Sequence, residues 1–91
     1  MKFLVVGLGS MGKRRVRNLI ALNQDKKNIA GFDINDSRLK ESFTKYRIDI
    51  FSDFQKAIKE FNPDILIIST PPNLHMKYAY FAYENGLNAF I

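Results

Sequence analysis

The chain has no cysteine, and it has one histidine, His75, among its 91 residues. Without cysteine, neither a disulfide framework nor a thiolate metal site can form, and one histidine does not make a metal site by itself. We therefore expect no bound metal. A reducing, cytoplasmic location fits the lack of cysteine.

Long apolar runs are also missing. No stretch approaches the roughly 20 consecutive apolar residues that cross a bilayer, and the run FLVV at 3–6 is too short for the core of a signal peptide. The formal net charge is +5, but the lysines and arginines are scattered and form no stripe interleaved with aromatic residues. We expect neither a membrane nor a nucleic acid as partner.

Short apolar runs do recur at intervals along the chain. Each is bounded by turn residues and is continuously apolar, which is typical of strands buried on both faces of a parallel sheet. The runs lie at 3–6, 29–32, 65–68 and 89–91, and a weaker one lies at 48–51. The sequence thus predicts five strands.

The segments between these strands have apolar residues at helical spacing, so each predicted helix buries one face. The shared faces are Val16, Leu19 and Ile20; Leu39, Phe43 and Tyr46; Phe54, Ala57, Ile58 and Phe61; and Leu74, Tyr78, Phe81 and Ala82. With right-handed crossovers, this alternation predicts one α/β domain over 1–91. Its form is a Rossmann-like, three-layer open parallel sheet of strand order 3-2-1-4-5, with helices on both faces.

Polar residues at the expected helix starts can accept hydrogen bonds from free N–H groups of the first turn. Asn35 or Asp36 is expected to cap the second helix, Asp53 or Ser52 the third, and Asn73 the fourth.

Three glycines follow the first strand as Gly7-Leu8-Gly9-Ser10-Met11-Gly12 and lead into a helix. In that context Gly7 permits a tight turn, Gly9 lets the backbone approach a pyrophosphate, and Gly12 lets the helix lie close to the strand. A diphosphate would then lie over the helix N-terminus, where free N–H groups favour an anion. The alternative is a tight strand-to-helix turn that binds no ligand.

Asp33 follows the second strand, 21 residues after Gly12. An acid here can accept hydrogen bonds from the adenosine ribose hydroxyls and repels the 2′-phosphate of NADP, which favours NAD as cofactor. Asp33 could instead cap the following turn. Arg38 and Lys40 keep NADP open, because a basic group near the ribose could pair with a 2′-phosphate. Arg14 or Arg15 could lean toward the phosphates as a charge clamp, but we expect both to be solvated, because the helix dipole already favours the anion.

The fourth strand leads into the loop Ser69-Thr70-Pro71-Pro72-Asn73-Leu74-His75, at the sheet end where open α/β folds bind ligands. The two prolines stiffen this loop by fixing φ. Ser69, Thr70 and Pro71 could therefore form a wall for the ribose and nicotinamide. The imidazole of His75 suits acid–base work, but its place near a helix start favours a structural hydrogen bond.

Four segments together resemble the N-terminal domain of the Gfo/Idh/MocA (glucose-fructose oxidoreductase/inositol 2-dehydrogenase) family: GLGSMG, GFDIN, NPDILIISTPPNLH and ENGLNAFI. The resemblance covers essentially the whole chain. It implies an NAD- or NADP-dependent oxidoreductase that transfers hydride to or from sugars, cyclitols and related hydroxy compounds. Carried over by position, it implies a diphosphate loop at Gly7, Gly9, Ser10 and Met11, a ribose acid at Asp33, and a cofactor loop at Thr70, Pro71, Asn73 and His75.

Family members usually continue from the fifth strand into a Glu-Lys-Pro segment and a substrate-binding domain that often oligomerises, and neither is in this sequence. We therefore expect the 91 residues to contain no catalytic residue and to be inactive alone. A non-catalytic nucleotide-sensing module and an interaction domain without ligand are the alternative functions. We also expect an apolar sheet edge at Ala89, Phe90 and Ile91 that promotes self-association.

Overall fold

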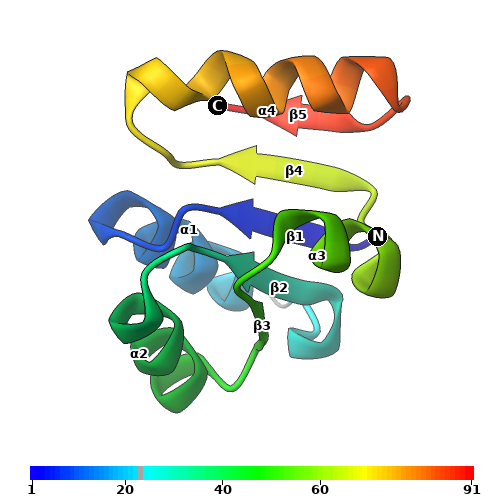
Figure 1. Cartoon of the computed structure of the whole chain (residues 1–91). Helices are drawn as coiled ribbons and strands as arrows, with labels where there is room; N and C mark the ends of the chain where they lie inside the picture. The colour runs from blue at the N-terminus through cyan, green and yellow to red at the C-terminus, as the bar shows by residue number, and fades with distance from the viewer. Residues whose placement is uncertain (23) are drawn as a thin grey trace.

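The computed structural model describes residues 1–22 and 24–91, and strands and helices alternate along it (Figure 1). The elements in chain order are β1 (Phe3–Val6), α1 (Ser10–Ala21), a 3-10 turn (Lys26–Asn28), β2 (Ile29–Phe32), α2 (Asp36–Tyr46), β3 (Asp49–Phe51), α3 (Phe54–Phe61), β4 (Ile65–Ile68), α4 (Pro72–Glu84) and β5 (Asn88–Phe90). The strands at 3–6, 29–32 and 65–68 have the predicted bounds.

The five strands form one parallel sheet in the order β3-β2-β1-β4-β5, as predicted. β1 lies in the middle, and its first residue, Phe3, is paired with Ile29 of β2 and with Ile65 of β4. The chain moves outward from β1 in one direction to β2 and β3, and in the other to β4 and β5. The order therefore reverses beside β1, and the carboxyl ends of β1, β2 and β4 meet at one edge of the sheet.

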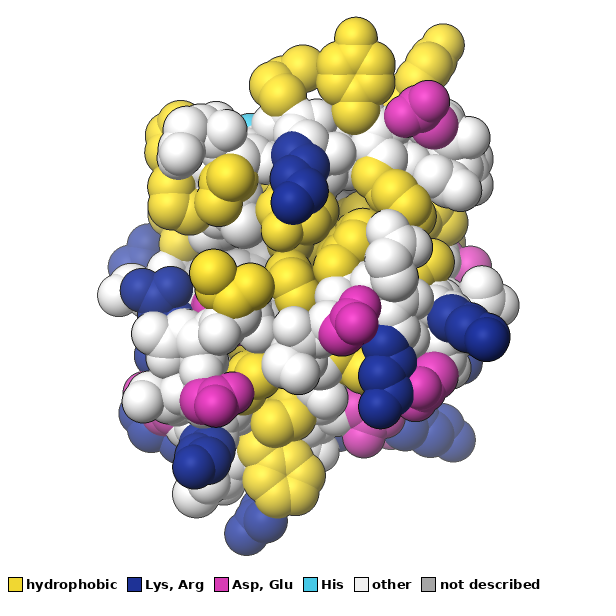
Figure 2. Space-filling model, in the orientation of Figure 1, with side chains coloured by type: hydrophobic (Ala, Val, Ile, Leu, Met, Phe, Trp, Pro, Cys, Tyr) yellow, Lys and Arg dark blue, Asp and Glu magenta, His cyan; other side chains and the backbone are white. Residues whose placement is uncertain are grey.

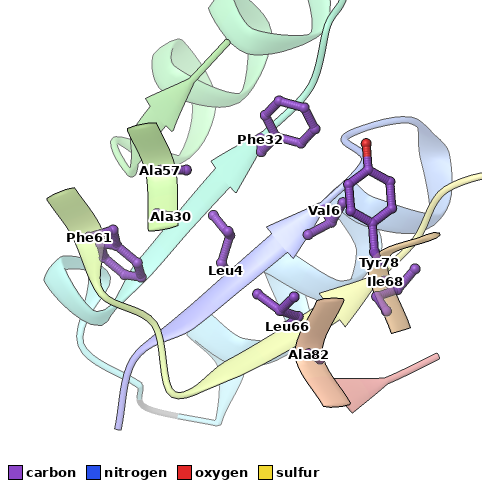
Figure 3. Close-up of a cluster of buried hydrophobic side chains, with 10 residues drawn as sticks. All are labelled: Leu4, Val6, Ala30, Phe32, Ala57, Phe61, Leu66, Ile68, Tyr78 and Ala82. Atoms are coloured by element: carbon purple, nitrogen blue, oxygen red, sulfur yellow. The ribbon is translucent and has the colours of Figure 1, made fainter. Parts of the chain in front are cut away.

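Two apolar layers enclose the sheet, so helices cover both of its faces, as predicted. On one face, side chains of α3 and α4 pack against β1, β2 and β4 (Figure 3). On the other face, Val16 of α1 and Leu39 of α2 pack against Val5, Ile29 and Ile67. Alternate residues of β1 point to opposite layers, which explains why this strand is continuously apolar.

The fifth strand differs from the prediction of a buried strand at 89–91. β5 runs from Asn88 to Phe90 and is exposed along its whole length, because it pairs with β4 alone and forms an edge of the sheet. On α2, Phe43 is 47% exposed although its spacing predicted a core position, and Ser42 is buried in its place.

Side chains cap two of the helices at the predicted residues. Asn35 accepts a hydrogen bond from the backbone N–H of Arg38 at the start of α2, and Asp53 accepts one from that of Lys56 at the start of α3. The prediction that Asn73 caps α4 is wrong. That helix begins at Pro72, so Asn73 lies within its first turn, and no side chain caps it among the described residues. Proline suits the first helical position because an N–H there would have no partner within the helix.

Within the described residues, no helix is both long and apolar enough to cross a bilayer.

Candidate functional site

The turn that follows β1 depends on a glycine conformation. Gly7 has φ of +96°, which L side chains rarely adopt, and a Cβ atom there would lie 3.0 Å from the carbonyl oxygen of Ser69. Its N–H donates to the carbonyl of Phe32 at 2.8 Å, so the turn begins while the chain is still hydrogen-bonded to β2. The loop is thereby held between the ends of β2 and β4.

The other two glycines of the motif differ in what surrounds them. A Cβ atom on Gly12 would lie 1.8 Å from the carbonyl oxygen of Gly7, so α1 can approach the end of β1 only because this residue has no side chain. Gly9 has φ of −71°, which any residue adopts, and its nearest neighbour would be the Arg38 guanidinium carbon at 3.7 Å. The absence of a side chain at Gly9 therefore serves no packing need and leaves the backbone open to a ligand.

The N-terminus of α1 lies directly beyond this loop. No side chain among the described residues caps it, in contrast to α2 and α3. Gly9 occupies the cap position, and its carbonyl accepts the first helical hydrogen bond from Lys13. The first N–H groups of the helix point toward the loop, and with the helix dipole they form a seat for an anion.

Asp33 is buried at the end of β2 and holds two chain segments. One carboxylate oxygen, Oδ2, accepts the N–H of Leu8 at 2.8 Å, and the other, Oδ1, accepts the N–H of Asn35 at 2.9 Å. The second bond is the turn cap considered in the sequence analysis. The first joins the acid to the glycine loop and could not be predicted, because it links residues 25 positions apart. An ionised carboxylate has about four acceptor sites, so acceptor capacity remains for a ligand.

Arg38 lies beside this acid, in the first turn of α2. Its Nη1 is 3.6 Å from Oδ2 of Asp33, and its side chain is 50% exposed where that of Asp33 is 5% exposed. The guanidinium therefore lies over the buried carboxylate and faces the backbone of Gly9.

The loop after β4 forms the opposite side of the site. Ser69, Thr70 and Pro71 follow the strand, and the N–H of Ser69 still donates to Val6 at 2.7 Å. The side-chain hydroxyl of Thr70 is buried and has no hydrogen-bond partner among the described residues. A buried hydroxyl without a partner costs free energy, and a bound polar ligand would remove that cost.

Two further residues of this loop do not line the site. Asn73 is exposed on the first turn of α4. The ring nitrogen Nε2 of His75 is hydrogen-bonded to the carbonyl oxygen of Thr70. A carbonyl only accepts, so Nε2 carries the proton and the imidazole holds the loop in shape. This is the structural hydrogen bond that the sequence favoured for His75.

These segments together enclose a cleft of about 440 Å³ at the carboxyl ends of β1, β2 and β4. Its lining residues are Gly7, Gly9, Ser10, Met11, Phe32, Asp33, Ile34, Arg38, Ser69, Thr70, Pro71, Leu74 and Tyr78. Eight of the predicted site residues line it directly, and Gly12 acts from beneath by letting α1 pack close to the end of β1. Such a crevice, where strand order reverses, is where open α/β sheets bind ligands.

The apolar part of the cleft was not predicted from the sequence. Ile34 is 84% exposed directly after Asp33, and Leu74 and Tyr78 reach the cleft from α4. Burial and the negative charge of Asp33 raise the pKa of Tyr78 above its usual value of 10, so its hydroxyl stays neutral. Figure 3 shows the Tyr78 ring beside the end of β1, with its hydroxyl directed away from Ile68. The signal available in the sequence was the apolar residue Ile34 directly after the acid, for which no role was predicted.

The expectation that Arg15 is solvated is wrong, because its guanidinium is hydrogen-bonded within the chain. Its Nη1 donates to the carbonyl of Ile68 at 2.8 Å and to the hydroxyl of Ser69 at 3.1 Å. Its guanidinium also lies 5.4 Å from the centre of the Phe90 ring. Arg15 therefore supports the end of β4 from the face opposite α4, whereas Arg14 is exposed. The described residues contain no cluster of three side chains suited to hold a metal ion.

Comparison with known proteins identifies the family of the chain. Residues 1–91 match a family model described as "Oxidoreductase family, NAD-binding Rossmann fold", the GFO_IDH_MocA family. No curated protein sequence matches the chain.

Solved structures share the fold. The WlbA dehydrogenase from Bordetella pertussis, in complex with NADH and UDP-GlcNAcA, has a TM-score of 0.85 and 22% identity over 97% of this chain and 27% of that chain. Myo-inositol 2-dehydrogenase from Lactobacillus plantarum has a TM-score of 0.84 and 23% identity over 98% of this chain and 26% of that chain. UDP-N-acetylglucosamine 3-dehydrogenase GnnA from Acidithiobacillus ferrooxidans has a TM-score of 0.80 and 26% identity over 98% of this chain and 28% of that chain.

The chain thus spans little more than a quarter of the length of these structures. The family model, in contrast, matches all 91 residues, and the glycine loop, the acid after β2 and the crevice lie where a dinucleotide-binding fold needs them. The chain belongs to the Gfo/Idh/MocA oxidoreductase family and forms its NAD-binding Rossmann-fold domain.

Proposed function

We propose that the cleft at the carboxyl ends of β1, β2 and β4 binds NAD. The observation that carries this proposal is the uncapped N-terminus of α1, which opens into the same cleft as the buried acid Asp33. The diphosphate of a dinucleotide would bind at the uncapped N-terminus of α1, and its ribose hydroxyls would bind at Asp33. The loop Gly7–Gly9 sets the spacing between these two positions.

Each group of residues has a separate part in binding. The open backbone at Gly9, Ser10 and Met11 holds the diphosphate, while Gly7 and Gly12 shape the loop and bring α1 close to it. Asp33 accepts from the adenosine ribose with the acceptor sites that Leu8 and Asn35 leave free.

The loop Ser69–Thr70–Pro71 borders the nicotinamide half, and the Thr70 hydroxyl gains there the partner that it lacks. His75 contributes through the Thr70 carbonyl that it holds. Asn73, which the resemblance includes in this loop, faces solvent, so its contact with the cofactor stays a prediction.

The whole protein is, in this proposal, a cytoplasmic oxidoreductase that acts on a sugar, a cyclitol or a related hydroxy compound. The support is the family and the dehydrogenases among its structural neighbours. When bound, NAD supplies the hydride acceptor, and the chain holds and orients it. Among the described residues that line the cleft, none is a free group suited to take the hydroxyl proton, because Tyr78 is kept neutral and Asp33 is tied to the loop. We therefore expect this chain alone to bind without turnover.

Calorimetric titration of the chain with NAD and with NADP tests the proposal. NAD should bind more tightly, because the carboxylate of Asp33 repels a 2′-phosphate. The same samples, supplied with sugars and cyclitols, should produce no reduced nicotinamide absorbance above buffer. No heat with either dinucleotide, or a preference for NADP, would contradict the proposal, and turnover that depends on His75 would place the chemistry in this chain.

A further inference from the structure

Arg15 is a partly buried cation that contacts only neutral groups. Its Nη1 donates to the carbonyl oxygen of Ile68 at 2.8 Å and to Oγ of Ser69 at 3.1 Å. On the other side, its guanidinium carbon lies 5.4 Å from the centre of the Phe90 ring. Within the part of the chain that the structure describes, Arg15 forms no ion pair. Burial of a charge without a countercharge costs free energy, which indicates that this guanidinium has a use besides packing.

The contact with Arg15 determines how the hydroxyl of Ser69 can be used. A guanidinium only donates, so Oγ of Ser69 is the acceptor in this hydrogen bond. A hydroxyl has one hydrogen, and the described residues contain no hydrogen bond in which Oγ of Ser69 donates that hydrogen. The hydrogen is therefore left for a ligand. The positive charge on the accepting side also polarises the O–H bond and makes it a stronger donor.

The surroundings of Ser69 leave the cleft as the open direction for this hydrogen. The backbone of Ser69 is fixed, because its N–H donates to the carbonyl of Val6 at 2.7 Å. Its Cβ atom lies 3.6 Å from the position that a Cβ atom on Gly12 would take, so α1 lies close against one side of the side chain. Arg15 approaches Oγ from the same helix, and Ser69 also lines the cleft.

We propose that Arg15 is a positioning residue for the cofactor. By donating to Oγ, it makes Ser69 a fixed hydrogen-bond donor toward the nicotinamide riboside half of NAD, which offers acceptors at its ribose oxygens and its carboxamide carbonyl. Arg15 itself does not touch the cofactor. The inference rests on the proposed function, because Ser69 lines the cleft in which NAD is proposed to bind.

The test compares Arg15→Met, Ser69→Ala and the double variant with Arg14→Met. Arg15→Met keeps an unbranched side chain but removes the donor. Arg14 is the exposed neighbour on the same helix, does not line the cleft, and loses the same unit of charge in its variant.

The parent and each variant are titrated calorimetrically with NAD and with ADP, which has the adenosine and the diphosphate but no nicotinamide riboside. The measured quantity is the ratio of NAD to ADP affinity, which cancels a general loss of binding. Urea unfolding of the free variants checks that they fold. Arg15→Gln, which loses the charge but keeps a polar end, takes the place of Arg15→Met if that variant does not fold.

Arg15→Met and Ser69→Ala should each lower the NAD-to-ADP ratio about fivefold, the size expected for one hydrogen bond. The double variant should lower it no further than Ser69→Ala alone, because Arg15 acts through Ser69. Arg14→Met should leave the ratio within about twofold of the parent.

Equal weakening of NAD and ADP by Arg15→Met would overturn the inference and would show that Arg15 serves the fold alone. Additive effects in the double variant would also overturn it, because Arg15 would then act without Ser69. Binding of neither NAD nor ADP by the parent would overturn the proposed function, and this inference with it.

Discussion

At the scale of the residue, the site is built by side chains that serve the fold and the ligand together. Asp33 shows this most clearly. The same carboxylate that faces the cleft holds the N–H groups of Leu8 and Asn35, so it fixes the glycine loop and the start of α2 before any ligand arrives. The two alternatives that the sequence left open for Asp33, turn cap and ribose acceptor, are therefore compatible. The structure contains the first, and the second stays a proposal.

The glycines make a matched pair of variants. Gly9→Val should leave the fold intact, because a Cβ atom there meets nothing closer than 3.7 Å, but it should abolish NAD binding because the side chain covers the open backbone. Gly12→Ala should destabilise the domain by about 3 kcal/mol, near the top of the usual cost of overpacking, because its Cβ atom would meet the Gly7 carbonyl at 1.8 Å.

Urea unfolding and calorimetric titration with NAD separate the two effects. Normal NAD binding by Gly9→Val would argue against the diphosphate position, and a Gly12→Ala domain as stable as the parent would argue against the close approach of α1.

At the scale of the element, charged residues join α1 to α2 on one side of the cleft. Glu41 of α2 lies 3.2 Å from Lys13 of α1 and 3.5 Å from Lys45 of its own helix. The hydrogen bond from Lys13, supported by both positive charges, lowers the pKa of Glu41 below its usual value of 4.5. A lowered pKa in the folded state stabilises the fold above the unfolded-state pKa, and this stabilisation is lost as the pH falls through the folded value.

Glu41→Gln should therefore lower the urea midpoint at pH 7 and should match the parent near pH 3. Glu60→Gln serves as the control, because Glu60 pairs at 3.9 Å with Lys56 on its own helix and joins no second element. Its midpoint should change less at pH 7. A Glu41→Gln midpoint equal to that of the parent at pH 7 would show that the link between α1 and α2 does not stabilise the fold.

Elements also show what the sequence could predict. The strands at 3–6, 29–32 and 65–68 were predicted at their bounds because strands buried on both faces leave a continuous apolar run. β5 is an edge strand, as the predicted strand order requires, but its apolar run wrongly indicated a strand that is buried on both faces. Asn73 was a wrong cap because Pro72 begins α4 one residue earlier.

The candidate site also has parts that could be predicted from the sequence and parts that could not. Its glycine loop, acid and Ser69–Thr70–Pro71 wall follow from residue type and place along the chain. The contacts of Asp33 with Leu8, of Arg15 with Ile68 and of Arg38 with Asp33 depend on how separate elements meet in space. Tyr78 reaches the cleft for the same reason, although helical spacing had placed it in the core. No local pattern records such contacts.

At the scale of the whole molecule, two surfaces stand out. Hydrophobic side chains gather over α4 at the top of Figure 2, where Met76, Tyr80 and Tyr83 are exposed, while the basic residues on that view are scattered. The second surface is the β5 edge, where Phe90 is 61% and Ile91 53% exposed. Unpaired backbone groups beside apolar side chains favour pairing between chains.

We therefore expect this chain to self-associate through the β5 edge as its concentration rises. Sedimentation velocity should show a mass that increases with concentration, and Phe90→Lys should shift the chain toward monomer, because a charge on an edge strand opposes pairing. Tyr83→Lys, which adds the same charge to exposed α4, should not. A parent chain that stays monomeric at millimolar concentration would contradict this prediction.

The central claim, that the cleft beside β1 binds NAD, is tested most directly by following the backbone amide resonances of the ¹⁵N-labelled chain during titration with NAD. The account predicts saturable shifts at Gly9, Ser10 and Met11, and at Asp33 and Thr70, with resonances of the outer face of α4 unchanged. Gly9→Val should remove these shifts. Absence of any shift, or shifts confined to Met76, Tyr80 and Tyr83, would contradict the claim.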